Sequence, residues 1–136
     1  MKNFVLMLSL IFGLTMTASA QDPGSDVRFV IIHTAGKTWN PKLSMFEQPY
    51  ILTNPNVGQE NLTHVNHYKK LLASGKLLMG GPFLDAQGAV GDQVGMMIPT
   101  EGTSGEDLRA FAADDPAVKA GVLEFEVRRW LIGMKQ

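Results

Sequence analysis

The segment from Val27 to Thr34 most constrains the fold, because its pattern is that of a strand that is apolar on both faces. Its β-branched and aromatic residues favour extended structure. One face would carry Val27, Phe29 and Ile31, and the other Val30 and Ile32. A strand of this kind needs cover on both sides, so we expect it near the middle of a sheet.

The elements after this strand alternate between helical and extended patterns. The apolar stripe over residues 59–74 predicts a helix, which Gly75 ends as a left-handed residue. Residues 76–84 and 90–99 predict two strands, the second apolar on both faces. A second helix is predicted from Ser104 to Asp114, with one more turn over 118–121, and a half-buried last strand over 122–131.

The order β-α-β-β-α-β predicts an α+β fold of the ferredoxin-like, split βαβ type. Two helices can cover only one face of a four-stranded sheet. Because the first and third strands are apolar on both faces, the other face needs cover too, and a second copy of the chain would supply it. We therefore expect a homodimer with sheets packed face to face.

The first twenty residues are typical of a secretory signal peptide and do not belong to the fold. A short basic start precedes an apolar run from Phe4 to Thr17, and Ala18-Ser19-Ala20 forms a cleavage site. A membrane anchor is the alternative, but the run is shorter than the roughly 20 residues that span a bilayer. We expect a signal at 1–20, a leader at 21–26, a domain at 27–132 and a tail at 133–136, with the mature protein periplasmic or secreted and off the membrane.

Composition excludes several classes of function. With Cys 0, the chain has no disulfide, no thiolate chemistry and no cysteine-ligated metal. Its Lys+Arg 12 and Asp+Glu 13 give a net charge of −1, which does not favour nucleic acid as a partner. The proline-rich loop over residues 35–58 is long, and two interpretations stay open: its aromatic residues fix it to the body, or it closes over a ligand.

The candidate site lies at one rim of the predicted sheet. His64 starts the first helix there, and the second strand, which runs parallel to the first, ends there before Asp85. The second helix brings Asp114 and Asp115 to the same rim. A carboxylate beside a histidine fixes its tautomer and makes it a general base, so His64 and Asp85 are the predicted catalytic pair. A hydrogen bond at a helix edge and a turn residue are the structural alternative.

Other residues have more limited roles in this interpretation. Gly80 and Gly81 mark a place where a ligand approaches the backbone closely, and Asp115 is a further predicted ligand-binding residue. Metal binding by His64, His67 and Asp85 is an alternative, disfavoured because the helical period points His67 toward solvent. We expect no metal and no organic cofactor, with haem on His64 as a further alternative. His33 is expected to be packed in the sheet or exposed at its end.

Several of these residues resemble the YCII-related family. The resemblance rests on His64, Gly75, Lys76-Leu77-Leu78, Gly80-Gly81-Pro82 and Asp85, and continues through Asp114-Asp115-Pro116, Ala120-Gly121-Val122 and 127–130. It covers roughly residues 58–132. It implies a dimeric α/β barrel of ferredoxin-like protomers and a pocket whose His–Asp pair maps onto His64 and Asp85. In one branch the family dehydrochlorinates a chlorinated hydroquinone, whereas most members have no assigned reaction.

Two functions are compatible with these residues. The first is a proton-transfer enzyme of the lyase or isomerase type, acting on a small organic molecule. The second is a periplasmic protein that binds a small ligand without catalysis, with His64 as a hydrogen-bond donor. The sequence does not name the substrate.

Overall fold

The structure is a computed structural model, and it describes residues 26–89 and 93–134. The signal peptide predicted over 1–20, most of the leader and the start of the predicted strand 90–99 lie outside the described residues. Export therefore stays a prediction. Within the described part of the chain, no helix has the length and apolar character that crossing a membrane requires.

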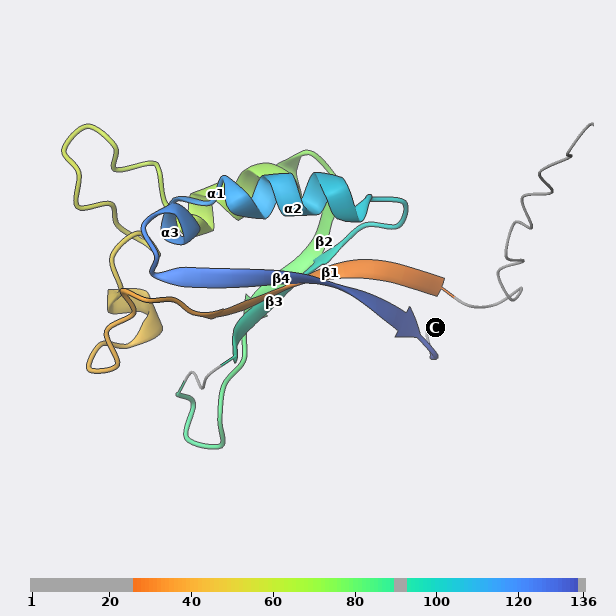
Figure 1. The fold of residues 1–136 in the computed structure, drawn as a ribbon, viewed down its shortest axis with the longest axis horizontal. Helices are drawn as coiled ribbons and strands as arrows, with labels where there is room; N and C mark the ends of the chain where they lie inside the picture. The colour runs from red at the N-terminus through yellow and green to blue at the C-terminus, as the bar shows by residue number, and fades with distance from the viewer. Residues whose placement is uncertain (1–25, 90–92, 135–136) are drawn as a thin grey trace, which may run out of the picture.

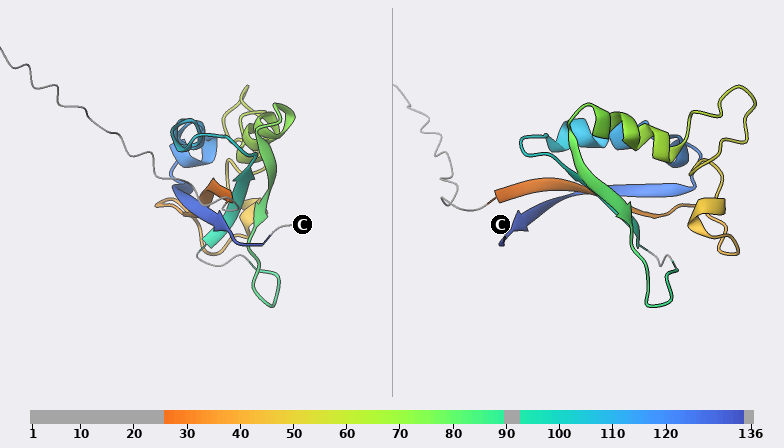
Figure 2. Two further views of the ribbon diagram at one scale, coloured as in Figure 1. Left: turned by 90° about the vertical axis from the view of Figure 1, so that its right-hand side faces the viewer. Right: turned by 180° about the vertical axis from the view of Figure 1, so that it is seen from behind.

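The described residues form a four-stranded sheet with helices on one of its faces (Figures 1 and 2). The elements in chain order are β1 (Asp26–Ala35), the short 3-10 helix η1 (Met45–Glu47), α1 (His64–Ala73), β2 (Leu77–Pro82), β3 (Gln93–Pro99), α2 (Gly105–Ala113), α3 (Pro116–Lys119) and β4 (Leu123–Ile132). The first helix begins five residues later than predicted, because Thr63 caps it by accepting a hydrogen bond from the Asn66 backbone N–H.

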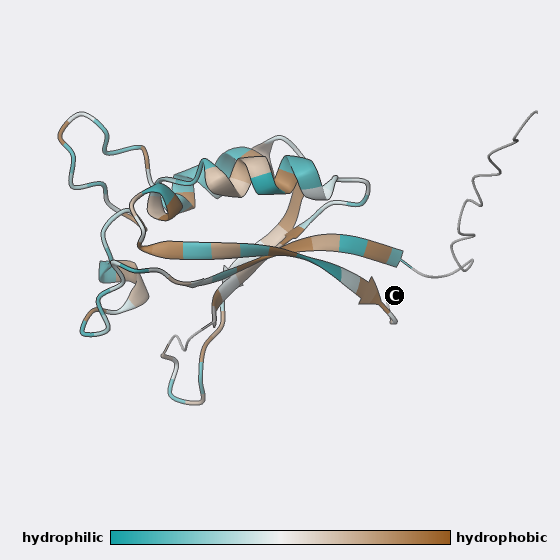
Figure 3. Cartoon of the chain, viewed as in Figure 1, coloured by the Kyte–Doolittle hydropathy of each residue, from teal (hydrophilic) through white to brown (hydrophobic). Residues whose placement is uncertain are grey.

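The strand order is β2-β3-β1-β4, and every neighbouring pair is antiparallel. This order confirms the ferredoxin-like α+β fold. The strands predicted to be apolar on both faces, β1 and β3, take the two central positions. Figure 3 shows apolar and polar residues alternating along β4, which lies at one edge.

Two apolar clusters hold the helices to the sheet. The first lies between the sheet and the two long helices, around Ile31, Tyr68 and Leu108. The second lies at the end of the sheet where α3 and the long loop meet, around Ile51 and Leu123. Because Ile51 is fully buried in this cluster, the loop is part of the core, as the interpretation that it packs against the body expects.

The helices α1, α2 and α3 lie on one face of the sheet, and none of these three helices covers the opposite face (Figure 1). Val127 packs with the helices, so alternation along β4 places Trp130 on the opposite face, where it is 39% exposed. Ile32 and its cross-strand partner Met96 lie toward the same face. The homodimer stays a prediction, and this face is where it would form.

Candidate functional site

The candidate site is a His–Asp pair at the end of the sheet where α1 and α3 begin. His64 is the first residue of α1, and its backbone N–H donates to the Tyr50 carbonyl, which fixes the start of the helix to the long loop. Its Nδ1 lies 2.6 Å from Asp115 Oδ2. Both side chains are buried, with at most 4% of either exposed. We call His64 and Asp115 the dyad.

Asp115 is held in place by the helix that it caps. It is the N-cap of α3, and its Oδ1 accepts the Ala117 backbone N–H at 2.9 Å. Pro116 follows as the first helical residue, where its missing N–H costs no hydrogen bond. One carboxylate oxygen thus fixes the side chain, and the other is left to face His64.

The charge state of Asp115 follows from this environment. Burial raises the pKa of Asp115. The hydrogen bond and positive charge from His64, together with the hydrogen bond from the Ala117 N–H, lower it by more than burial raises it, so the pKa of Asp115 lies below its ordinary value. Asp115 is therefore a carboxylate near neutral pH. It accepts a hydrogen bond from His64 Nδ1. In the neutral imidazole, Nε2 of His64 is then the nitrogen that can accept a proton.

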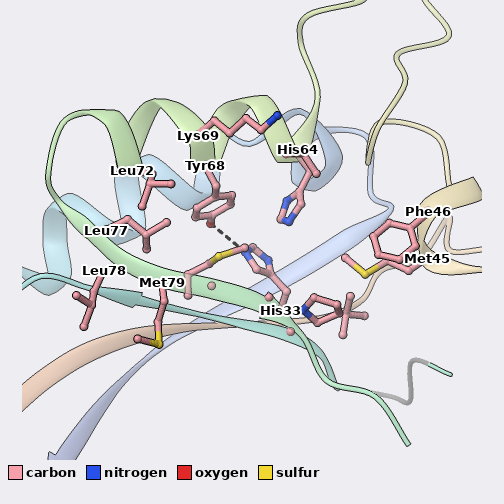
Figure 4. A pocket seen from close by; sticks show the side chains of 17 residues that line it. His33, Met45, Phe46, His64, Tyr68, Lys69, Leu72, Leu77, Leu78 and Met79 are labelled. Carbon is pink, nitrogen blue, oxygen red and sulfur yellow. Dashed lines mark hydrogen bonds between the residues drawn. The ribbon is translucent and has the colours of Figure 1, made fainter. Parts of the chain in front are cut away.

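His33 and Tyr68 complete a cluster of rings beside the dyad. His33 comes from β1 and is 1% exposed, and its Nε2 lies 2.9 Å from the Tyr68 hydroxyl. The His33 and His64 ring centroids are 5.0 Å apart and nearly perpendicular. Figure 4 shows His33 reaching up from the sheet and His64 reaching down from α1 toward it.

Burial also sets the protonation of these two side chains. Desolvation, and then the charge on His64, lower the pKa of His33 to about 4, so that its imidazole is neutral near pH 7. Burial, together with the charge on Asp115, raises the pKa of Tyr68 well above its ordinary value. Tyr68 thus keeps its proton and stays a hydrogen-bond donor at any physiological pH.

A cavity of about 410 Å³ opens next to the dyad (Figure 4). His33, His64 and Tyr68 form its polar inner end, and the exposed Lys69 also lines it. Its other walls are apolar, and they come from the loop, from α1 and from strands β2 and β3: Met45, Phe46, Leu72, Leu77, Met79 and Met97. We call this space the dyad cavity.

Glycines in β2 and β3 keep part of the cavity wall free of side chains. A Cβ added at Gly80 would lie 2.1 Å from Met97 Sδ, and one at Gly95 would lie 2.7 Å from the Gly81 carbonyl oxygen. At Gly81 nothing lies within 4 Å of an added Cβ. Gly80 and Gly81 line the cavity, and the close approach of a ligand to their backbone stays a prediction.

The structure replaces the predicted carboxylate partner of His64. Asp85 lies in the β2–β3 hairpin beyond the end of β2, it is exposed, and its Oδ1 accepts the backbone N–H groups of Gln87 and Ala89. It is the turn residue of the structural alternative. The predicted His64–Asp85 pair is not formed, and Asp115, which the predicted topology placed at the same rim, takes its position.

Two other histidine predictions also change. His67 was expected in solvent, yet it is 9% exposed, its ring stacks on Phe111 of α2, and its Nε2 donates to the Phe111 carbonyl at 2.7 Å. The alternative metal set of His64, His67 and Asp85 is therefore wrong. His33 is packed at the sheet as one expectation had it, but it also lines the dyad cavity, which was not foreseen.

Comparison with known protein families agrees with this arrangement. Residues 48–131, more than half of the chain, match the model of the YCII-related domain. The chain belongs to the YCII-related family. The match begins within the long loop, at residue 48, and includes both long helices and nearly all of β4. No match was found among curated proteins or among solved structures. In this YCII-related chain the buried His–Asp pair is His64 with Asp115.

Proposed function

We propose that this YCII-related chain is a proton-transfer enzyme in which His64 is the general base, Asp115 orients it, and a small organic molecule binds in the dyad cavity. The observation that carries the proposal is the 2.6 Å contact between His64 Nδ1 and Asp115 Oδ2 at the inner end of an apolar cavity. A histidine held by a buried carboxylate has one tautomer and one orientation, which is what proton abstraction requires.

The cavity limits the kind of molecule that can react. Its volume of about 410 Å³ lies in the range of small-ligand sites. Its walls favour an apolar body, and its polar groups gather at the inner end. A substrate with one polar group would place that group at the histidines and its apolar part against Met79 and Met97. The exposed Lys69 adds a cation that favours an acidic substituent.

The chemistry is then a proton abstraction with two outcomes. His64 Nε2 accepts a proton from a substrate carbon, and the electron pair of the broken C–H bond forms a double bond to the neighbouring atom, which gives up either its own π pair to an adjacent electron acceptor or a leaving group. In an isomerase step His64 returns the proton to another atom of the same molecule. In a lyase step a leaving group departs with its electron pair. Tyr68, which keeps its proton, supplies a donor beside the base that stabilises developing negative charge.

A non-catalytic ligand-binding protein is the second candidate. Both residues of the dyad have a structural role that needs no catalysis, because Asp115 caps α3 and His64 begins α1. This observation favours the binding protein. In that case His64 would donate a hydrogen bond to a ligand, and no product would form.

We also propose that the chain is exported and acts as a homodimer. Export is supported by the signal pattern of residues 1–20. Dimerisation is supported by apolar residues such as Trp130 on the sheet face that the helices leave uncovered. Light scattering coupled to size-exclusion chromatography at micromolar concentration should report twice the chain mass, and a monomer would contradict the dimer.

The experiment that tests the enzyme proposal is a ligand screen followed by an exchange assay. Small organic molecules that raise the melting temperature of the purified chain are incubated with it in D₂O, and NMR follows deuterium incorporation or product. The enzyme proposal expects exchange with the wild type and at least a hundredfold less with His64→Gln. Ligands that bind equally to both proteins, without exchange in either, would instead support the binding protein.

A further inference from the structure

A set of metal-ligating groups lies beside the inner end of the dyad cavity, where His33 and His64 line the wall and Asp115, which does not line it, contacts His64. His33, His64 and Asp115 each offer one ligand atom, and these three atoms lie within 4.8 Å of one another. The three residues come from β1, from the start of α1 and from the N-cap of α3, and none is more than 3% exposed. Among the described residues, no other group of three histidines or carboxylates has its ligand atoms this close together.

We propose that His33, His64 and Asp115 bind one divalent transition-metal ion at the inner end of the dyad cavity. Two imidazoles and one carboxylate suit zinc and its first-row neighbours, whereas calcium and magnesium prefer sites made of oxygen atoms. Three protein ligands leave coordination positions open toward the cavity, as in sites where a metal meets a ligand or water. This inference goes beyond the proposed function and does not depend on it.

An unsatisfied nitrogen supports the site independently of the cluster itself. His33 Nδ1 is buried and makes no hydrogen bond within the described residues. The backbone of Glu124 lies near enough to the His33 ring to raise its pKa as a hydrogen-bond partner, but it does not reach full hydrogen-bond geometry with Nδ1. A buried polar atom without a partner costs free energy and calls for an explanation, and a metal ion would complete it. The other nitrogen, Nε2, is already engaged with Tyr68.

The contact between His64 and Asp115 marks the place where an ion can replace a proton. Their 2.6 Å separation encloses one shared hydrogen. Donors that lie about 2.1 Å from one tetrahedral ion are about 3.4 Å from one another. The His64 and Asp115 donors, now 2.6 Å apart, would therefore move apart, and any donors as far apart as 4.8 Å would move together by about 1.4 Å. Asp115 Oδ1 keeps its hydrogen bond from Ala117, which anchors the carboxylate from behind.

This arrangement has a consequence for the base. An ion that replaces the shared proton separates His64 from Asp115. In the metal-free protein the proton acceptor is His64, whereas in the metal-loaded protein it would be a group bound at an open coordination position of the ion. Metal binding also releases a proton, and the affinity should rise with pH.

The test is a titration of the untagged, EDTA-treated full chain with Zn²⁺ by calorimetry and with Co²⁺ by visible absorption. We expect one ion per chain and a higher melting temperature with metal. His33→Ala and Asp115→Asn should each weaken binding at least tenfold. His67→Gln is the matched control, because His67 is buried in the same helix but outside the cluster, and it should bind as the wild type does.

Three results would overturn the inference: no stoichiometric binding of either ion, unchanged affinity in His33→Ala, or equal loss in His67→Gln. Circular dichroism establishes that each variant is folded, and His33→Gln replaces His33→Ala where the latter is not. The exchange assay on EDTA-treated protein separates the two proposals. Exchange without metal binding supports the proton-transfer enzyme and refutes the metal site. Metal binding without exchange supports the metal site and refutes the proton-transfer enzyme.

Discussion

Acidification should destabilise the metal-free protein through His33, in a pH window that the structure defines. Burial, then the charge on His64, lower the pKa of His33 from 6.5 to about 4. In the unfolded chain the same imidazole takes up a proton near pH 6.5. As the pH falls between these two values, the unfolded state binds a proton that the folded state does not. The free energy of unfolding therefore decreases as the pH decreases.

The size of the effect follows from the same two values. One pKa unit corresponds to about 1.4 kcal/mol, and the shift from 6.5 to about 4 therefore corresponds to a loss of about 3 kcal/mol from neutral pH to pH 4. This is a large fraction of the 5–15 kcal/mol that is typical of domain stability. The lowered pKa of Asp115 acts in a different window, because its contribution is lost as the pH falls from the ordinary aspartate value toward its lower folded value.

Urea unfolding between pH 7 and pH 4 in EDTA, followed by tryptophan fluorescence, measures this loss. In His33→Leu the slope of unfolding free energy against pH should flatten over the window. Tyr68→Phe is the matched control: it removes the hydroxyl partner of His33 but keeps the buried imidazole, so the slope should persist. A wild type whose stability does not change over the window, or a His33→Leu variant with the wild-type slope, would refute the reasoning.

Three further outcomes are expected from the site. Asp115→Asn keeps a good N-cap residue but removes the carboxylate that holds His64. The rate of exchange should fall by about a hundredfold or more. The melting temperature should fall less than in a variant that also loses the N-cap. Gly80→Ala forces its Cβ into Met97, so ligand affinity should fall and stability should drop by about 1–3 kcal/mol in thermal shift, whereas Gly81→Ala should behave as the wild type. Asp85→Ala should leave activity unchanged and cost under about 1 kcal/mol in urea unfolding, and a loss of turnover would return Asp85 to the site.

The fold could be predicted from the sequence because the hydrophobic pattern determines it. Strands that are apolar on both faces are expected in the middle of a sheet, and the alternating last strand is expected to have one buried and one exposed face. The rim of the site followed from the direction of the chain alone. The choice between Asp85 and Asp115 did not, because it depends on the hairpin after β2, where Asp85 bonds to its own turn rather than to the helix. No periodicity encodes where a hairpin projects.

The misplacement of His67 has a different cause. A helical wheel describes one helix, and it gives no account of a second helix that covers its flank. Phe111 of α2 stacks on His67 with ring centroids 3.9 Å apart, which turns a predicted surface position into a buried one. His33, in contrast, carried a usable signal: alternation from Phe29 and Ile31 places it on the face that the helices cover.

The burial of the dyad bears on how variants of it should be interpreted. A buried ion pair contributes little net stability relative to apolar residues of the same volume, because desolvation offsets the attraction between the charges. Removing His64 nevertheless costs about 3–5 kcal/mol, since the charge of Asp115 then stays buried and unpaired. A large loss of stability in a single dyad variant therefore does not establish a structural role for His64 and Asp115. Apolar residues would hold α1 and α3 together at least as well, so the presence of a histidine and a carboxylate at 2.6 Å beside a cavity favours a chemical role.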